Sequence, residues 1–494
     1  MASFIGIDLG TTYSSVSYLD DTGRPQIIRN SEGANLTPSC IEINDEEIIV
    51  GEYARRGLGW NDKVLARFKR DMGTSEKYKV EDQEFTPTQC SAFVLRKLLQ
   101  DAKDAIGEVG EAVVTIPANF TNEARVETIK AAKEAKLKVK NIVNEPTAAA
   151  LYYVFKNGGT LNGNFAVYDL GGGTFDISII QVKNKDVVVL ASEGVKKLGG
   201  DDFDAALQEI VQKKYKDATG ENLDIRKGYT KTDAEEDKKS LSKRDRVNVR
   251  VEKTNIELTR YEFENEIKPL LAQTKMSCEI AIEEAGLKLK DITDVLLVGG
   301  STRVPYVTES VKEIFKKEPV TTVNVDEAVC LGASLFSAIK GNPEDLTPVQ
   351  KASIKELTVS DVAVGCFGTF AYRGGTHEKF NSVLILKNEK IPCSVTETYT
   401  TMYDNQTEVD CTITQTNTPT EDLNWVNIIW DGKLLLPSGR KRGRKIDVTY
   451  AYDENGTMHA SFVDVESGEE TYTQLSDISP QDDNGGGPDR FTVA

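Results

Sequence analysis

The stretch FAVYDLGGGTFDISII, residues 165–180, restricts the fold of this chain more than any other part of it. Two apolar runs typical of buried strands flank three consecutive glycines, and Asp169 and Asp176 bracket these glycines. A hairpin turn needs only one or two glycines. Three glycines followed by Thr174 indicate that a ligand approaches the backbone closely at this turn.

A second stretch, FIGIDLGTTYSSVSYL, repeats the order of strand, Asp-Leu-Gly, hydroxyl side chains and strand. Backbone N–H groups in such a glycine turn form an anion site, and magnesium prefers oxygen ligands and keeps several waters. For a single Gly-Gly-Gly a structural turn is the default. Two matched turns predict a duplicated fold that holds phosphate and a hydrated magnesium ion between its halves, with Asp8 and Asp169 near the metal.

The order of elements changes along the chain. Residues 1–342 alternate strand runs with helical periodicity, which predicts an α/β domain. In this part VGGSTRVP, from Val298, is a third glycine turn at a strand end, where ligands of open α/β sheets lie. Thr259 and Glu262 form a capping-box pattern that predicts a helix start. No stretch matches the Walker lysine pattern.

From about residue 357 short alternating runs replace the helical pattern. KIDVTYAYDENGTMHASF predicts a hairpin that turns at Asn455-Gly456. We therefore predict a β-domain over residues 362–475, a polar linker over 343–361, and a disordered acidic, glycine-rich tail over 476–494.

Composition excludes several classes of function. The net charge of −18 argues against nucleic-acid and anionic-membrane surfaces. Seven scattered cysteines without Cys-x-x-Cys indicate neither a disulfide framework nor a zinc site. Two histidines far from the glycine turns argue against histidine triads and histidine metal sites. The chain has no basic leader and no membrane-spanning run, so we expect a cytoplasmic protein.

Five motifs together resemble one family. IGIDLGTTYSSV, VNEPTAAAL, VYDLGGGTFDISI, LGGDDFD and VGGSTRVP stand in the order found in the seventy-kilodalton heat-shock proteins, the DnaK-type chaperones. The resemblance covers residues 1–475. It implies an α/β actin-like ATPase domain of two lobes with a duplicated core, followed by an antiparallel β-sandwich that binds extended peptides.

The resemblance also implies roles for residues at matching positions. It implies a catalytic set of Lys69, Glu145, Asp169 and Thr174, with Lys69 facing the γ-phosphate and the attacking water. Magnesium and potassium would bind near Asp8, Asp169 and Asp176. The implied contacts to ATP or ADP are Gly10, Thr11, Thr12, Tyr13, Gly171, Gly172, Gly173, Gly199, Gly200, Glu235, Lys238, Lys239, Ser242, Gly299, Gly300, Ser301, Arg303 and Asp326. Lys239 replaces an arginine that is usual in the family and removes its planar stacking surface.

The resemblance places a peptide pocket in the β-domain. Its implied lining is Tyr399, Val409, Cys411 and Ile446, although the core of a sandwich explains the same alternation. The loop PSGRKRGRK, with basic residues over 440–445, is either a solvated loop or a patch for an acidic client or RNA.

The chain departs from the family at three places. Only about twenty residues follow the β-domain, so we expect no helical lid. Thr358 and Ser360 stand where apolar linker residues are usual, which would weaken linker docking by on the order of 1–3 kcal/mol. Asn141 stands where an arginine usually meets J-domain partners, so the sequence predicts a weakened J-domain contact.

The leading hypothesis is an ATP-dependent chaperone and ATPase for unfolded client polypeptides, assisted by a J-domain protein and a nucleotide-exchange factor. One alternative is a regulatory co-chaperone that binds ATP, hydrolyses it poorly and serves a fixed partner. Another is a sugar or acetate kinase with an actin-like fold, because fold does not fix function.

Overall fold

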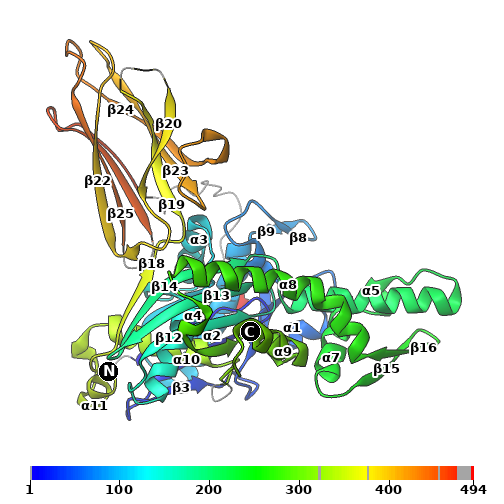
Figure 1. The fold of residues 1–494 in the computed structure, drawn as a ribbon. Helices are drawn as coiled ribbons and strands as arrows, with labels where there is room; N and C mark the ends of the chain where they lie inside the picture. The colour runs from blue at the N-terminus through cyan, green and yellow to red at the C-terminus, as the bar shows by residue number, and fades with distance from the viewer. Residues whose placement is uncertain are drawn as a thin grey trace. The chain divides into compact units, whose positions relative to one another are not determined.

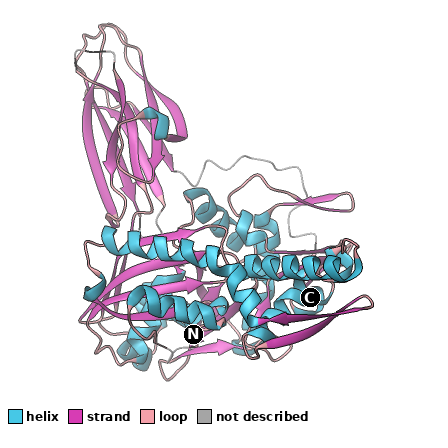
Figure 2. Cartoon of the chain, turned by 45° about the vertical axis from the view of Figure 1, so that its right-hand side comes forward, coloured by secondary structure: helices cyan, strands magenta, loops and turns pink. Residues whose placement is uncertain are grey.

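A computed structural model describes residues 3–320, 324–374, 376, 378–453, 457–474 and 491–493. Contacts divide the chain into two compact units. The first unit contains Met1–Asn119, Glu127–Val359 and Asp483–Ala494, and the second contains Phe120–Val126 and Ser360–Asp482. Figure 2 shows that helices and strands mix in the first unit, whereas the second is built almost entirely of strands.

The first sheet of the first unit has the strand order β11-β10-β1-β2-β3. Its strands are β1 (Ser3–Asp8), β2 (Tyr13–Leu19), β3 (Pro25–Ile28), β10 (Val109–Ile116) and β11 (Val139–Asn144), with the short β4 (Thr37–Pro38) against β2. Strand β1 runs parallel to β10 and antiparallel to β2. The first Asp-Leu-Gly turn therefore joins two neighbouring strands at one end of this sheet.

The second sheet repeats this arrangement. Strands β17 (Ile292–Val298), β12 (Gly163–Leu170), β13 (Phe175–Lys183) and β14 (Asp186–Val195) follow one another in space. Strand β12 runs parallel to β17 and antiparallel to β13, so the second Asp-Leu-Gly turn joins β12 and β13 as the first joins β1 and β2. The matched hairpins predicted from the sequence are both present.

Helices surround and join the two sheets (Figure 1). They are α1 (Glu52–Arg56), α2 (Pro87–Ile106), α3 (Asn122–Glu134), α4 (Glu145–Lys156), α5 (Gly200–Thr219), α6 (Ile225–Gly228), α7 (Lys231–Leu241), α8 (Arg260–Glu284), α9 (Pro305–Phe315), α10 (Ala328–Lys340) and α11 (Pro348–Ser353). Helices α4 and α10 touch so closely that a Cβ on Gly332 would lie 1.8 Å from the carbonyl oxygen of Ala148. The predicted capping box of Thr259 and Glu262 starts α8.

A small sheet completes the first unit, with the order β28-β6-β5-β7. It contains β5 (Cys40–Ile43), β6 (Glu47–Val50), β7 (Val64–Ala66) and β28 (Thr492–Val493). Residues 491–493 lie in the predicted disordered tail, yet they are ordered here because Phe491 buries its ring and β28 pairs with β6. Residues 475–490, most of that tail, lie outside the described residues. Two hairpins, β8 (Tyr78–Val80) with β9 (Gln83–Phe85) and β15 (Arg246–Val251) with β16 (Thr254–Thr259), stand apart from the sheets.

The second unit is an antiparallel β-sandwich. One sheet is β20 (Lys379–Ile385), β19 (Cys366–Tyr372), β23 (Glu408–Thr416) and β24 (Asn427–Leu435), and the other is β22 (Cys393–Thr400), β25 (Lys445–Tyr452), β26 (Met458–Asp464) and β27 (Glu470–Gln474). Both sheets contribute to one apolar core, in which Phe367, Tyr450 and Phe462 are fully buried. Strands β25 and β26 form the predicted hairpin, while its turn, Asn455-Gly456, lies outside the described residues.

No helix in the described ranges is both long enough and apolar enough to cross a membrane.

Candidate functional site

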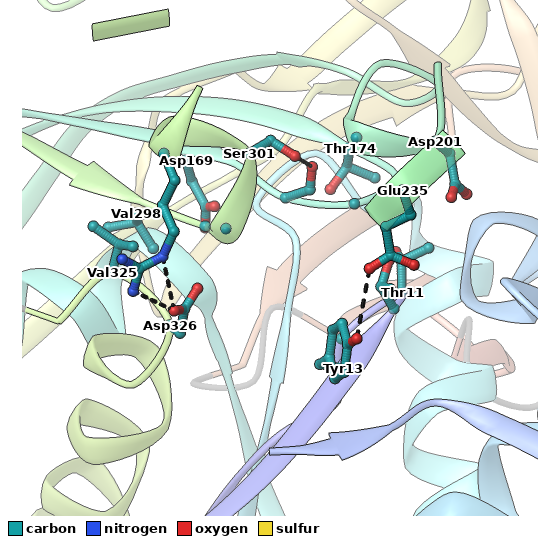
Figure 3. A pocket seen from close by; sticks show the side chains of 18 of the residues that line it. Thr11, Tyr13, Asp169, Thr174, Asp201, Glu235, Val298, Ser301, Val325 and Asp326 are labelled. Atoms are coloured by element: carbon teal, nitrogen blue, oxygen red, sulfur yellow. Dashed lines mark hydrogen bonds and ion pairs between the residues drawn. The ribbon is translucent and has the colours of Figure 1, made fainter. Parts of the chain in front are cut away.

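The three glycine turns surround one cavity of about 740 Å³ in the first unit. Figure 3 shows Thr11, Tyr13 and Glu235 on one side of it and Val298, Val325 and Asp326 on the other. Most of the predicted nucleotide and catalytic residues line it: Asp8, Gly10, Thr11, Thr12, Tyr13, Lys69, Glu145, Asp169, Gly171, Gly172, Thr174, Gly200, Glu235, Lys238, Lys239, Ser242, Gly299, Gly300, Ser301, Arg303 and Asp326. Three predicted residues, Gly173, Gly199 and Asp176, do not line it.

The two Asp-Leu-Gly turns meet at the cavity wall. A Cβ on Gly172 would lie 2.0 Å from the hydroxyl oxygen of Thr12, and a Cβ on Gly173 would lie 2.7 Å from a side-chain carbon of Thr11. Gly199 is equally constrained, because its Cβ would lie 2.6 Å from the backbone of Gly172. Gly173 therefore makes room for the side chain of Thr11, and Gly199 lets its backbone approach that of Gly172.

The third turn supports the second. Gly299 has a φ of +83°, which favours glycine, and a Cβ there would lie 2.4 Å from the carbonyl oxygen of Leu170. The Ser301 hydroxyl donates a 2.7 Å hydrogen bond to the carbonyl oxygen of Gly171 (Figure 3). This bond fixes the start of the Gly-Gly-Gly turn, which is closed by a 3.1 Å hydrogen bond from the backbone N–H of Gly171 to the carbonyl oxygen of Thr174.

Three buried acidic side chains, the partly buried Asp8 and one lysine gather near the turns. The ammonium of Lys69 donates a 2.5 Å hydrogen bond to Glu145, and both side chains are buried. Burial and the charge of Glu145 raise the pKa of Asp8 to about 7, against the opposite effect of Lys69. Burial, followed by the charges of Glu145, Asp176 and Asp8, raises the pKa of Asp169 well above its usual range.

Asp176 stands behind this group. It faces Asp169 across the β12–β13 ladder and accepts a 3.1 Å hydrogen bond from the backbone N–H of Asn119. Burial and then the charge of Glu145 raise the pKa of Asp176 to about 8. It contributes charge to the cluster without lining the cavity.

The donor set fits a hydrated magnesium ion. Within the described ranges, no three His, Cys, Asp or Glu side chains are grouped so as to hold a metal ion directly. Magnesium usually binds through one or two carboxylates and several waters, so it does not need such a group. Burial and then the charge of Glu145 raise the pKa values of both Asp8 and Asp169, and a nearby cation would offset both effects.

A second charged group lines the opposite end of the cavity. Lys239 and Arg55 lie 2.8 and 3.2 Å from the carboxylate of Glu235, and the Lys239 ammonium lies 5.6 Å from the centre of the Tyr13 ring. Burial opposes ionisation of Glu235, yet Lys239, Arg55 and Lys238 together lower its pKa to about 2. An ion pair and the face of the Tyr13 ring thus hold Lys239. An ammonium group can make both contacts, so neither of them requires the planar guanidinium of an arginine.

The cavity also contains residues that the sequence analysis did not assign. They are Leu36, Asp201, Asp204, Lys243, Val298, Val304, Val325 and Val329. Asp201, Asp204, Val298 and Val304 lie inside motifs already quoted, so the motifs contained a signal for them. Leu36, Val325 and Val329 form part of an apolar wall that no local pattern distinguishes from core.

Three arginines between residues 55 and 70 pair with acidic side chains on α5 and α7, and two of these acidic partners, Asp201 and Glu235, line the cavity. Arg67 pairs with Asp201 at 2.5 Å and Arg70 pairs with Asp202 at 3.1 Å, both on α5. Arg55 pairs with Glu235 on α7. We call these three pairs the clasp. The sequence analysis missed it, because its partners are far apart in the chain.

The predicted peptide residues belong to the core of the second unit. Cys411 and Ile446 are 0% and 2% exposed, whereas Tyr399 and Val409 are partly buried around the same core. The Tyr399 hydroxyl donates a 2.9 Å hydrogen bond to Ser382. The peptide-binding role of all four residues stays a prediction.

Other features singled out in the sequence have polar partners. The Thr358 hydroxyl donates a 2.5 Å hydrogen bond to Asp186, and its backbone N–H donates to the carbonyl oxygen of Lys185 at 3.2 Å. In the basic loop, Arg440 pairs with Asp464 and Glu466, so part of the charge of this loop is neutralised.

Comparison with known proteins gives one consistent result. The family described as "Hsp70 protein" matches residues 4–484. The chaperone protein DnaK of Thermotoga maritima is 36% identical over 486 residues, which are 94% of this chain and 79% of the relative. The chaperone protein DnaK of Thermosipho africanus is also 36% identical, over 497 residues, 94% of this chain and 78% of the relative.

Proposed function

This chain belongs to the Hsp70 family and is an ATP-dependent chaperone with ATPase activity, and from that premise we propose how its own residues bind and hydrolyse the nucleotide. Members of the family bind ATP or ADP with magnesium and assist protein folding. The names of its relatives favour this function over the regulatory co-chaperone and kinase alternatives.

The observation that carries the proposal is the meeting of the two glycine turns. Thr12 and Gly172 approach so closely that no side chain fits at residue 172. We assign the phosphates to the backbone N–H groups of residues 11–13 and 172–174, because the N–H groups of Gly10 and Gly171 already donate to Ser14 and Thr174. We assign the base and ribose to Glu235, Lys238, Lys239 and Ser242 on one side and to Gly300, Ser301, Arg303 and Asp326 on the other.

The buried charges then define the reaction. Lys69, held by Glu145, presents an ammonium to the charge that develops on the transferred phosphoryl group. Glu145, Asp169 and the hydroxyl of Thr174 orient the attacking water. Asp8 and Asp169 would hold a hydrated magnesium ion, which would supply positive charge to neutralise the phosphates. Potassium near Asp8 and Asp176 is part of the same proposal.

A glycine substitution tests the phosphate assignment. Gly172→Val should reduce ATP binding below detection in calorimetry, because the new side chain meets Thr12 and blocks the approach of the β-phosphate. Gly374→Val is the matched control, since a Cβ at Gly374 meets nothing within 4 Å. Native ATP affinity in the Gly172→Val chain, with both variants equally folded by circular dichroism, would contradict the assignment.

The second unit supplies the client site in this proposal. DnaK-type chaperones act on unfolded polypeptides with co-chaperones, and we assign extended apolar segments to the sandwich near Tyr399 and Val409. A J-domain protein and an exchange factor are the proposed partners, with Asn141 weakening the J-domain contact. Seven free thiols support a cytoplasmic location within the same proposal.

A further inference from the structure

The segment Phe491–Val493 is seated on the small sheet of the first unit. Thr492 and Val493 pair in parallel with Glu47 and Ile48 on β6. The backbone N–H of Thr492 donates a 3.1 Å hydrogen bond to the carbonyl oxygen of Glu46. A sheet edge without such a partner presents unpaired N–H and C=O groups, so β6 is a natural receptor for an added strand.

An aromatic pocket anchors the same segment. Phe491 is 4% exposed, and its ring lies 6.0 Å from that of Phe85 and 5.8 Å from that of Phe93, perpendicular to the latter. Arg96, on α2, donates a 3.3 Å hydrogen bond to the carbonyl oxygen of Phe491. The segment is therefore held by an inserted ring and by strand pairing together, as a docked peptide is.

The receiving sheet carries the clasp. Strand β6 leads directly into α1, which presents Arg55, and β7 leads into the turn of 3₁₀-helix at Phe68–Asp71, which contains Lys69 and Arg70. Arg67, between β7 and that turn, pairs with Asp201, which lines the cavity. The position of this sheet therefore sets the positions of the arginines that pair with α5 and α7 beside the cavity.

We propose that the edge of β6 and the pocket of Phe85 and Phe93 form a docking site for the chain's own segment Phe491–Val493, whose seating slows nucleotide release. The added strand holds β6, β5 and β7 together, and with them Arg55 and Arg67 on the clasp. Opening the cavity requires these arginines to leave α5 and α7, and a sheet held by one more strand resists that movement. The inference rests on the proposed nucleotide site in the same cavity.

The site selects its occupant by chemistry. The pocket takes an aromatic ring, the edge of β6 takes an extended backbone, and Val493 is a β-branched residue that suits a strand. An extended peptide with an aromatic residue followed by β-branched residues would compete with the seated segment.

The test uses the full chain with Phe491→Ala, which empties the pocket, and Thr492→Val as the milder variant. Thr492→Val keeps the buried ring and the backbone pairing of β28 and removes only the 3.1 Å hydrogen bond from the Thr492 hydroxyl to the carbonyl oxygen of Glu46. Stopped-flow release of a fluorescent ADP should be about fivefold faster or more in Phe491→Ala and near native in Thr492→Val. Added peptide GPDRFTVA, the sequence of residues 487–494, should restore slow release to Phe491→Ala, whereas the same peptide with alanine for phenylalanine should not.

A second readout does not depend on nucleotide. Fluorescence anisotropy of labelled GPDRFTVA should report binding to the Phe491→Ala chain at least tenfold tighter than to the native chain, whose site is filled. Absence of peptide binding to the variant overturns the docking site. Peptide binding with unchanged ADP release overturns the effect on the clasp. If neither chain binds ADP, the proposed nucleotide site fails while the anisotropy result still decides the docking site.

Light scattering tests whether the chain's own segment or the segment of a second copy fills the site. If the segment of a second copy fills the site, the native chain forms dimers that Phe491→Ala dissociates, and the intramolecular seat is overturned. A monomeric native chain with a filled site supports it.

Discussion

The acidic cluster beside the cavity of the first unit and the end of strand β26 in the β-sandwich both bury a carboxylate, and the pKa of the carboxylate is shifted in opposite directions in the two places. Asp464, on β26, is 0% exposed, receives hydrogen bonds from Arg440 and Ser467, and has its pKa lowered to about 2, chiefly by Arg440. Asp8 and Asp176 have pKa values raised to about 7 and 8 by burial and by Glu145. The sandwich satisfies its carboxylate from within the protein, whereas the cavity concentrates negative charge that a bound cation can relieve.

The two settings have opposite dependences on pH. A carboxyl group whose folded pKa is raised stabilises the fold below its unfolded pKa, and this stability is lost as pH rises through the folded pKa. Asp176 therefore favours the folded first unit below about pH 4 and loses that effect toward pH 8. A lowered pKa acts in reverse, so the contribution of Asp464 is present above about pH 4 and is lost as pH falls toward 2.

The largest effect should come from removing the ammonium group of Lys69. Lys69→Ala should leave ATP binding within a few-fold of native and reduce single-turnover hydrolysis by about a hundredfold or more, because the ammonium faces charge that develops only in the transition state. Lys63→Ala is the control, since Lys63 forms an exposed ion pair with Glu81. An unchanged rate in the Lys69 variant would remove Lys69 from the catalytic set.

Magnesium binding should report the raised pKa values directly. At pH 7 Asp176, with a pKa of about 8, is mostly protonated, so binding of magnesium-ATP should release about one proton and strengthen up to tenfold per pH unit between pH 6 and 7. Calorimetry in buffers of different ionisation enthalpy measures the proton count. The count should fall in Asp176→Asn, and an enthalpy independent of buffer would show that the cluster is ionised before the metal arrives.

Asp464, in the sandwich, should show a smaller dependence of stability on pH, of opposite sign to that of Asp176. Arg440→Met removes the main cause of the lowered pKa of Asp464, so acid unfolding of the second unit should begin about half a pH unit higher. Near-UV circular dichroism between pH 2 and 5 follows this transition. Arg442→Met is the control in the same loop, and equal acid midpoints for the two variants would mean that the ion pair of Arg440 does not stabilise the sandwich.

The smallest effect should come from changing Thr358, the neutral hydrogen-bond partner of the Asp186 carboxylate. The sequence predicts that Thr358 weakens linker docking, but its hydroxyl bonds to Asp186, so its polarity has a partner within the first unit. Thr358→Val keeps the shape and removes one hydrogen bond, a loss of about 1 kcal/mol, which should raise amide hydrogen exchange at residues 357–359 about threefold to fivefold. Thr358→Leu tests the expectation that an apolar residue at position 358 strengthens docking of the linker. Slower exchange in that variant would support this expectation.

Several features of the fold and site follow from short stretches of sequence. The hairpins that carry Asp8 and Asp169, the start of α8 at Thr259 and the pairing of β25 with β26 each depend on residues within one or two strands or turns. Glycine freedom, capping and alternation act over such distances, so pattern alone predicts them. The motifs also predicted most of the cavity lining, because each motif lies on a turn that the strands bring to one edge.

Other features depended on contacts between distant segments. Gly173 and Gly199 permit close packing of the turns without lining the cavity, the clasp joins Arg67 to Asp201, and Cys411 and Ile446 are core residues. Phe491 is the clearest case, because its stretch has the composition of a disordered tail and yet its ring is buried between Phe85 and Phe93. Burial and pKa depend on which surfaces meet, and a partner hundreds of residues away leaves no periodic signal in the local sequence. Local backbone preference was therefore readable from the chain, whereas the pairing of its charges and the seat of its last strand required the folded structure.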